Sequence, residues 1–226
     1  MVKKRSRRIL FIAILLVVII ILAFVIFLGS ESGQVVPGVE EGDEFIYDVK
    51  GFWGSNDPNV TLPENFLQLN MTEWYKITVT GVSDSQVSID TTWRFTNETE
   101  LKGTGTVNVE TGIYYPTNGF YGVYAANLKT NDRLRPSGID HSTINQTSTR
   151  DYASGTRETN TVSLILQYYD ADDPSYSTTW TEYITIHFDR QTGMLVELRD
   201  INLYTNPQQT LTIVWKIKES NVWTVS

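Results

Sequence analysis

The stretch Val87–Phe95, VSIDTTWRF, shows most clearly how this chain folds. Large apolar side chains and one threonine stand at every second position and alternate with polar side chains. Successive side chains of a β-strand point to opposite faces, so a period of two is typical of a strand with one buried and one wet face. The same pattern recurs in six further segments: Phe45–Val49, Tyr75–Val79, Val162–Tyr168, Ile184–Phe188, Met194–Leu198 and Leu211–Ile217.

Short turns separate several of these segments. Asp189–Gly193 (DRQTG) joins two of them, Glu110–Gly112 (ETG) resembles the same device, and GVSDS at Gly81–Ser85 precedes Val87–Phe95. Asp can cap the start of a tight turn, and Gly accepts positive φ at its end. Such turns predict an antiparallel curved sheet or half-barrel in a mainly β domain, with a β-sandwich as the alternative.

One or two short helices are expected beside the sheet. Thr61–Glu64 (TLPE) has the form of a capping box and opens a helix to about Leu69. Phe120–Lys129 is the second candidate. This combination resembles the architecture of periplasmic lipoprotein-carrier half-barrels.

The N-terminus predicts a membrane anchor. Residues 9–28 form an unbroken apolar run of 20 residues, long enough for the roughly 30 Å bilayer core, and residues 1–8 carry five positive charges. The positive-inside rule places this tail in the cytoplasm and everything after Leu28 outside. We therefore expect a basic tail at 1–8, a transmembrane signal-anchor helix at 9–28, a linker at 29–38 and an extracytoplasmic β domain at 39–226. A cleaved signal peptide and a pilin-like helix are the alternatives.

Composition excludes several classes of function. The 226 residues include 18 Lys+Arg, 26 Asp+Glu, 2 His and no Cys, for a net charge of −8. Disulfides, thiolate metal sites and cysteine nucleophiles are therefore excluded. All acidic residues follow the apolar run, so the external part repels nucleic acid and anionic headgroups. We expect no nucleic-acid partner and no cofactor.

Aromatic residues are the candidates for a ligand groove. Rings line apolar grooves or stack on sugars, although they also fill the cores of sheets. The groove candidates are Trp53, Trp74, Trp93, Tyr114, Tyr115, Phe120, Tyr121 and Tyr124.

Other polar motifs suggest modification or metal binding. Asn-x-Ser/Thr sequons stand on the side predicted to be external, which makes glycosylation a candidate. The sequons begin at Asn59, Asn70, Asn97 and Asn145. Asp170, Asp172 and Asp173 are weak calcium candidates, because Pro174 interrupts the ligand spacing of a calcium loop. No other metal site is expected, and His141 and His187 have no nucleophile at supporting spacing.

The whole pattern resembles uncharacterised archaeal-type single-pass surface proteins with an extracytoplasmic β domain. The resemblance rests on the Ile/Val-rich anchor, the acidic cysteine-free exterior, the sequons, AANL at Ala125–Leu128 and FDRQTG at Phe188–Gly193. It implies no activity.

These observations predict a binding or interaction module on the outer face of the cytoplasmic membrane, not an enzyme. Its candidate partners are the membrane through the N-terminal helix, a lipid or other apolar ligand, a glycan, or an envelope protein. The alternatives are an envelope structural subunit, in a surface layer or filament, and a glycan hydrolase that uses a carboxylate pair.

Overall fold

The computed structural model describes residues 35–62, 64–115, 121–169 and 178–226, and Val35–Ser226 form one compact unit. Within these ranges the elements are β1 (Glu44–Ser55), α2 (Glu64–Asn70), β2 (Thr72–Ser83), β3 (Gln86–Phe95), β4 (Glu100–Asn108), β5 (Tyr114–Tyr115), β6 (Gln146–Tyr152), β7 (Gly155–Tyr169), β8 (Thr178–Asp189), β9 (Leu195–Thr205) and β10 (Gln208–Ser220). The prediction of a mainly β domain is confirmed, and each of the seven alternating segments lies within or overlaps a strand.

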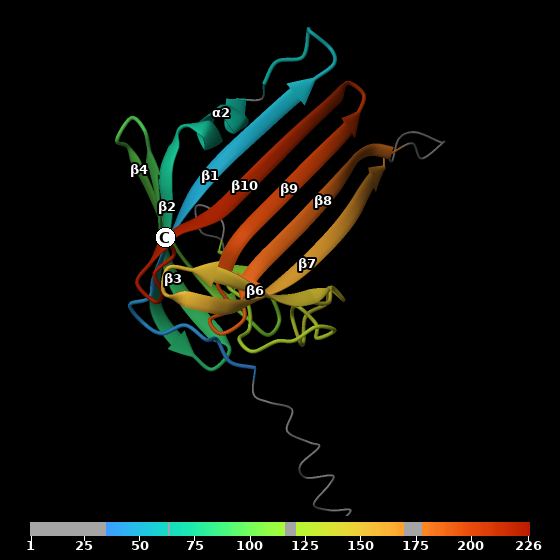
Figure 1. Ribbon diagram of the computed structural model, residues 1–226. Coiled ribbons are helices and arrows are strands. Elements are labelled where there is room, and N and C mark those ends of the chain that lie inside the picture. Colours follow the sequence, from blue (N-terminus) through green and yellow to red (C-terminus); the bar gives the residue numbers. More distant parts are fainter. Residues whose placement is uncertain (1–34, 63, 116–120, 170–177) are drawn as a thin grey trace, which may run out of the picture. The chain divides into compact units, whose positions relative to one another are not determined.

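The described strands form one ten-stranded antiparallel sheet (Figure 1). Its order is β5-β4-β3-β2-β1-β10-β9-β8-β7-β6, so that two meanders meet where β1 pairs with β10. A β-sandwich consists of two sheets packed face to face, whereas the described strands form a single sheet. The sandwich alternative is therefore wrong, and the expected antiparallel sheet is an open, curved one.

One face of this sheet carries the core. Residues paired across antiparallel strands point to the same face, so Val49, Trp215, Leu198 and Ile186 form one row across β1, β10, β9 and β8. Rings fill the centre of this core face: Tyr75 and Trp215 meet edge to face with centroids 5.0 Å apart. The buried Tyr47 hydroxyl donates to the Leu195 carbonyl oxygen at 3.0 Å, which satisfies the polar group inside the core.

Residues 121–145 connect the first meander to the second and close one end of the core (Figure 1). The expected helix at Phe120–Lys129 is wrong for its described part, 121–129, which contains no helix. Here the backbone bonds to other segments: Tyr124 N–H donates to the Gly193 carbonyl, and Leu195 N–H donates to the Gly122 carbonyl. Val123, Tyr124 and Ala125 are all buried, whereas an amphipathic helix would bury one face.

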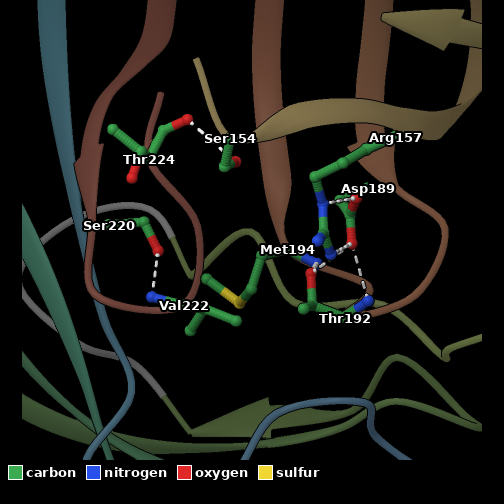
Figure 2. A network of polar contacts seen from close by, with 8 residues as sticks. All are labelled: Ser154, Arg157, Asp189, Thr192, Met194, Ser220, Val222 and Thr224. Carbon is green, nitrogen blue, oxygen red and sulfur yellow. Dashed lines mark hydrogen bonds and ion pairs between the residues drawn. The ribbon is translucent and has the colours of Figure 1, made fainter. Parts of the chain in front are cut away.

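The predicted turn at Asp189–Gly193 is confirmed, and an ion pair holds it in place (Figure 2). The Asp189 carboxylate, 1% exposed, accepts from Arg157 Nε at 2.7 Å and from the Thr192 backbone N–H and hydroxyl at 2.8 Å each. Gly193 takes φ +76° at the end of the turn. The Arg157 guanidinium also lies 4.5 Å from the ring centre of Trp223, so this pair ties the β8–β9 hairpin to β7 and the C-terminal segment.

The helix expected from Thr61–Glu64 is confirmed as α2. It packs so closely on β1 that a Cβ on Gly51 would lie 2.6 Å from the Phe66 ring. The anchor expected at 9–28 lies outside the described residues. Among the residues that are described, no helix is long and apolar enough to cross a membrane.

Candidate functional site

The core face continues past the buried core toward the far ends of β7, β8, β9 and β10. Beyond the core row, the next row in register contains Leu164, Ile184, Asp200 and Ile213, and each of these side chains is partly exposed. Figure 1 shows these strands extending away from the end that residues 121–145 close. The sheet therefore presents an inward face on which polar groups replace core residues. We call this region, from Leu164 and its row to the strand ends, the distal face.

A row of aromatic rings crosses the distal face near the strand ends. Tyr168, Trp180 and Tyr204 occupy paired positions on β7, β8 and β9. Tyr168 and Trp180 stack with centroids 4.1 Å apart and planes 12° apart, and Trp180 and Tyr204 stack at 5.7 Å and 26°. Stacking of this kind orders the rings and forms an aromatic strip across three strands.

Two carboxylates lie between this aromatic row and the core. Glu182 Oε2 accepts from the Tyr168 hydroxyl at 2.6 Å, and Asp200 Oδ1 accepts from Asn202 Nδ2 at 2.8 Å. Burial and the neighbouring Glu182 carboxylate raise the pKa of Asp200 to about 6. The hydrogen bond from the Tyr168 hydroxyl to Glu182 raises the pKa of Tyr168, because loss of the phenol proton would break that bond. Partly desolvated carboxylates with raised pKa are common in functional sites.

Trp53 is the predicted groove residue that lies on the distal face. It pairs in register with Leu211 of β10, which pairs with Asn202 of β9. Its indole N–H donates to Gln209 Oε1 at 3.2 Å, and Gln209 pairs with Tyr204. Trp53 therefore lies in the row of Glu182, one row nearer the core than the aromatic row, and adds a ring to the distal face on β1.

The structure places the other predicted groove residues elsewhere. Trp93 packs into the core, with its ring centre 5.4 Å from that of Trp215. Trp74 pairs with Arg94, one position out of phase with the core residue Tyr75, on the outer face of the sheet.

The tyrosines of the predicted groove gather near residues 121–145. Tyr114 and Tyr121 stack at 4.3 Å, and Tyr115 is exposed. Tyr124 stacks on Phe188 at 4.7 Å and lies under the Arg135 guanidinium, 4.5 Å from the ring centre. Burial raises the pKa of Tyr124 to about 12, against the opposing influence of Arg135. Phe120 lies outside the described residues.

The remaining candidates occupy separate parts of the surface. Asn59, Asn70, Asn97 and Asn145 are all exposed, as surface modification sites would require. His187 lies on the outer face of β8 with Nδ1 2.9 Å from the Thr161 hydroxyl, and burial lowers its pKa. The calcium candidates Asp170, Asp172 and Asp173 lie outside the described residues.

Sequence reasoning missed the acidic and aromatic residues of the distal face, although a signal was present. Trp180, Glu182 and Ile184 alternate in phase, and Asp200 continues the phase of Val196 and Leu198. A carboxylate at a position that the period assigns to the core marks either a strand end or a site.

Comparisons with known proteins do not identify the chain. No protein-family model matches it, and no curated protein matches its sequence. Among solved structures, a "putative lipoprotein" from Parabacteroides distasonis is similar, with a TM-score of 0.41 and 13% identity over 81% of this chain and 99% of that chain.

Proposed function

We propose that this protein is an extracytoplasmic binding module, held at the outer face of the cytoplasmic membrane by residues 9–28, whose ligand lies on the distal face. The observation that carries the proposal is the Tyr168–Trp180–Tyr204 row beside the Glu182 and Asp200 carboxylates, on a sheet face that otherwise forms the core. Apolar walls with a few convergent polar groups are typical of ligand sites.

The chemistry of the distal face favours a neutral amphiphile. Its half-buried apolar row, with Leu164, Ile184 and Ile213, can cover an acyl or isoprenoid portion. Glu182 and Asp200 accept hydrogen bonds, so they select hydroxyl or amine donors and disfavour anions. A sugar-bearing lipid meets both conditions.

Binding without turnover is the expected activity. Glycoside hydrolases hold their two carboxyl groups roughly 5–9.5 Å apart, on either side of the scissile bond. Glu182 and Asp200 instead lie side by side on the same face of the neighbouring strands β8 and β9. That arrangement suits recognition better than the acid–base pair of a glycan hydrolase.

Three probes test the proposal by native mass spectrometry and tryptophan fluorescence on residues 33–226. Dodecyl maltoside below its micelle concentration carries tail and sugar, maltose carries the sugar alone, and laurate carries a tail with an anionic head. We expect saturable binding of dodecyl maltoside, weakened about tenfold or more by Trp180→Ala and by Glu182→Gln. Trp74→Ala on the outer face is the matched control and leaves affinity unchanged. Equal binding to both tryptophan variants would refute the assignment of the distal face.

A second candidate function, assembly into an envelope structure, is favoured by the outer face. There Phe52, Tyr183 and Ile165 are 57%, 39% and 66% exposed, and register pairing through Thr212 and Ile201 places them in one row across five strands. Exposed apolar rows of this kind mark interaction surfaces. Light scattering of the purified domain, with Ile165→Asp as the variant, distinguishes a subunit that self-associates from a monomeric binder.

A further inference from the structure

The β3–β4 hairpin combines an aromatic residue with a sequon in one tight turn. Glu98 N–H donates to the Phe95 carbonyl at 2.9 Å, and Phe95 N–H donates to the Thr99 carbonyl at 3.0 Å. Glu98 has φ +69°, so the turn contains a residue in the left-handed region. Phe95, Asn97 and Thr99 therefore stand at alternate positions of one ordered five-residue turn.

These three residues line the same surface cavity. The cavity measures about 420 Å³, and Met71 at the end of α2 and Leu101 of β4 add apolar walls. Both are exposed, at 43% and 46%. Trp93 stacks on the Phe95 ring at 5.9 Å and 16°, which fixes the orientation of that ring. The cavity is thus an exposed apolar hollow with an asparagine amide at its wall.

The Asn97 side chain is oriented for modification at nitrogen. Its Oδ1 accepts from the Thr99 hydroxyl at 2.7 Å and from the Thr99 N–H at 3.1 Å. Within the described ranges no hydrogen bond engages its Nδ2, whereas Nδ2 of Asn59 donates to Asp57 at 3.0 Å. Of the four sequons, that of Asn97 is preceded at the −2 position by an aromatic residue, and the others have Asp57, Gln68 and Thr143 there.

We propose that Asn97 carries an N-linked glycan whose first sugar lies in this cavity against the Phe95 ring. In the transfer, Asn97 Nδ2 attacks C1 of a sugar on a polyprenyl phosphate or diphosphate donor. The N–C1 bond forms, the bond from C1 to phosphate oxygen breaks, and the amide loses one proton as the phosphate leaves. The donor and its transferase belong to the cell, and the chain supplies the acceptor and the cavity.

The cavity then acts on the attached sugar in two ways. A pyranose has an apolar face of C–H groups, which packs on an aromatic ring as another apolar group would. Covering Phe95, Met71 and Leu101 removes apolar surface from water and stabilises the hairpin. This inference does not depend on the distal face or its ligand.

The test uses the full chain expressed in a yeast or insect secretory pathway and extracted in detergent. Peptide mass spectrometry gives the occupancy of each sequon, and an endoglycosidase then trims each glycan to its first sugar. We expect Asn97 to be occupied and the one-sugar form to melt about 2–4 °C above Asn97→Gln. Phe95→Leu keeps an apolar group against Trp93 and should abolish the difference in melting temperature between the one-sugar form and Asn97→Gln. Asn59→Gln is the matched control and should leave the melting temperature unchanged.

A second measurement does not depend on the stability of the variants. Amidase release of the glycan from the native protein should be at least tenfold slower at Asn97 than from the denatured chain, and Phe95→Leu should remove that protection. An unmodified Asn97, whichever other sequons are occupied, would overturn the proposal. Equal melting temperatures with and without the sugar would overturn the contact with the Phe95 ring. A rate of amidase release that is the same in Phe95→Leu as in the unsubstituted protein would overturn it as well.

Discussion

Replacing Asp200 by Asn tests the electrostatics of the distal face. The pKa of Asp200 rises from an ordinary value of 3.8 to about 6, because burial and Glu182 oppose its charge. A shift of this size corresponds to about 3 kcal/mol between the charged and neutral forms. Since Asp200 is partly exposed, solvent screening reduces the expected effect on stability to about 1–2 kcal/mol.

The sign follows from proton linkage. Between pH 4 and pH 6 the folded state binds this proton more tightly than the unfolded state, so the contribution of Asp200 to stability rises as pH falls through this window. Above about pH 6 the carboxylate is charged in both states, and the folded protein bears the full penalty. Asp200→Asn should therefore stabilise the domain by about 1–2 kcal/mol at pH 7.5 and by close to nothing at pH 4.

Urea unfolding of residues 35–226 at the two pH values measures this difference directly. The substituted amide can still accept the hydrogen bond from Asn202, so the comparison isolates the charge. Glu41→Gln, at an exposed carboxylate, is the control and should change stability by less than about 0.5 kcal/mol at either pH. The reasoning would be refuted if Asp200→Asn were less stable than the unsubstituted protein at pH 7.5. It would also be refuted if the difference in stability between the two proteins were the same at pH 4 and at pH 7.5.

Three further predictions concern the hairpins and the outer face. Gly193→Ala should lower the free energy of unfolding by about 2–4 kcal/mol, because φ is +76° and an added Cβ would clash with the Tyr124 carbonyl oxygen. Gly54→Ala, where an added Cβ meets open space, is the control, and equal melting temperatures of the two variants would contradict the prediction. Arg157→Ala should destabilise the domain by about 3–5 kcal/mol, because it leaves the buried Asp189 carboxylate without its cation. Denaturant unfolding measures this loss, and a loss under about 1 kcal/mol would contradict a stabilising role of the ion pair. If the outer face mediates assembly, Ile165→Asp on β7 should lower the mass measured by light scattering, whereas Thr181→Asp on the same face of β8 should not; an unchanged mass of Ile165→Asp would remove the assembly role.

The strands could be predicted where one face is apolar and the other polar. Val87–Phe95 and Leu211–Ile217 show the period of two because their inner side chains meet a core and their outer ones meet water. β6, QTSTRDY, lacks that contrast because it is an edge strand with no fully buried side chain. Its existence depends on pairing with β7, which a local pattern does not record.

The sequence by itself determined the alternation, the turns at Asp189–Gly193 and Glu110–Gly112, the short helix and the aromatic and acidic inventory, because each of these depends on neighbours within a few positions. Tertiary structure decided which of those residues meet. Register carries Tyr168, Trp180 and Tyr204 into one row and brings Glu182 to Asp200, whereas the tyrosines close together in sequence, from Tyr114 to Tyr124, divide between surface and core. Strand pairing joins positions 12 to 24 residues apart here, and such distances are fixed by the packing of the whole sheet and not by any short stretch of chain.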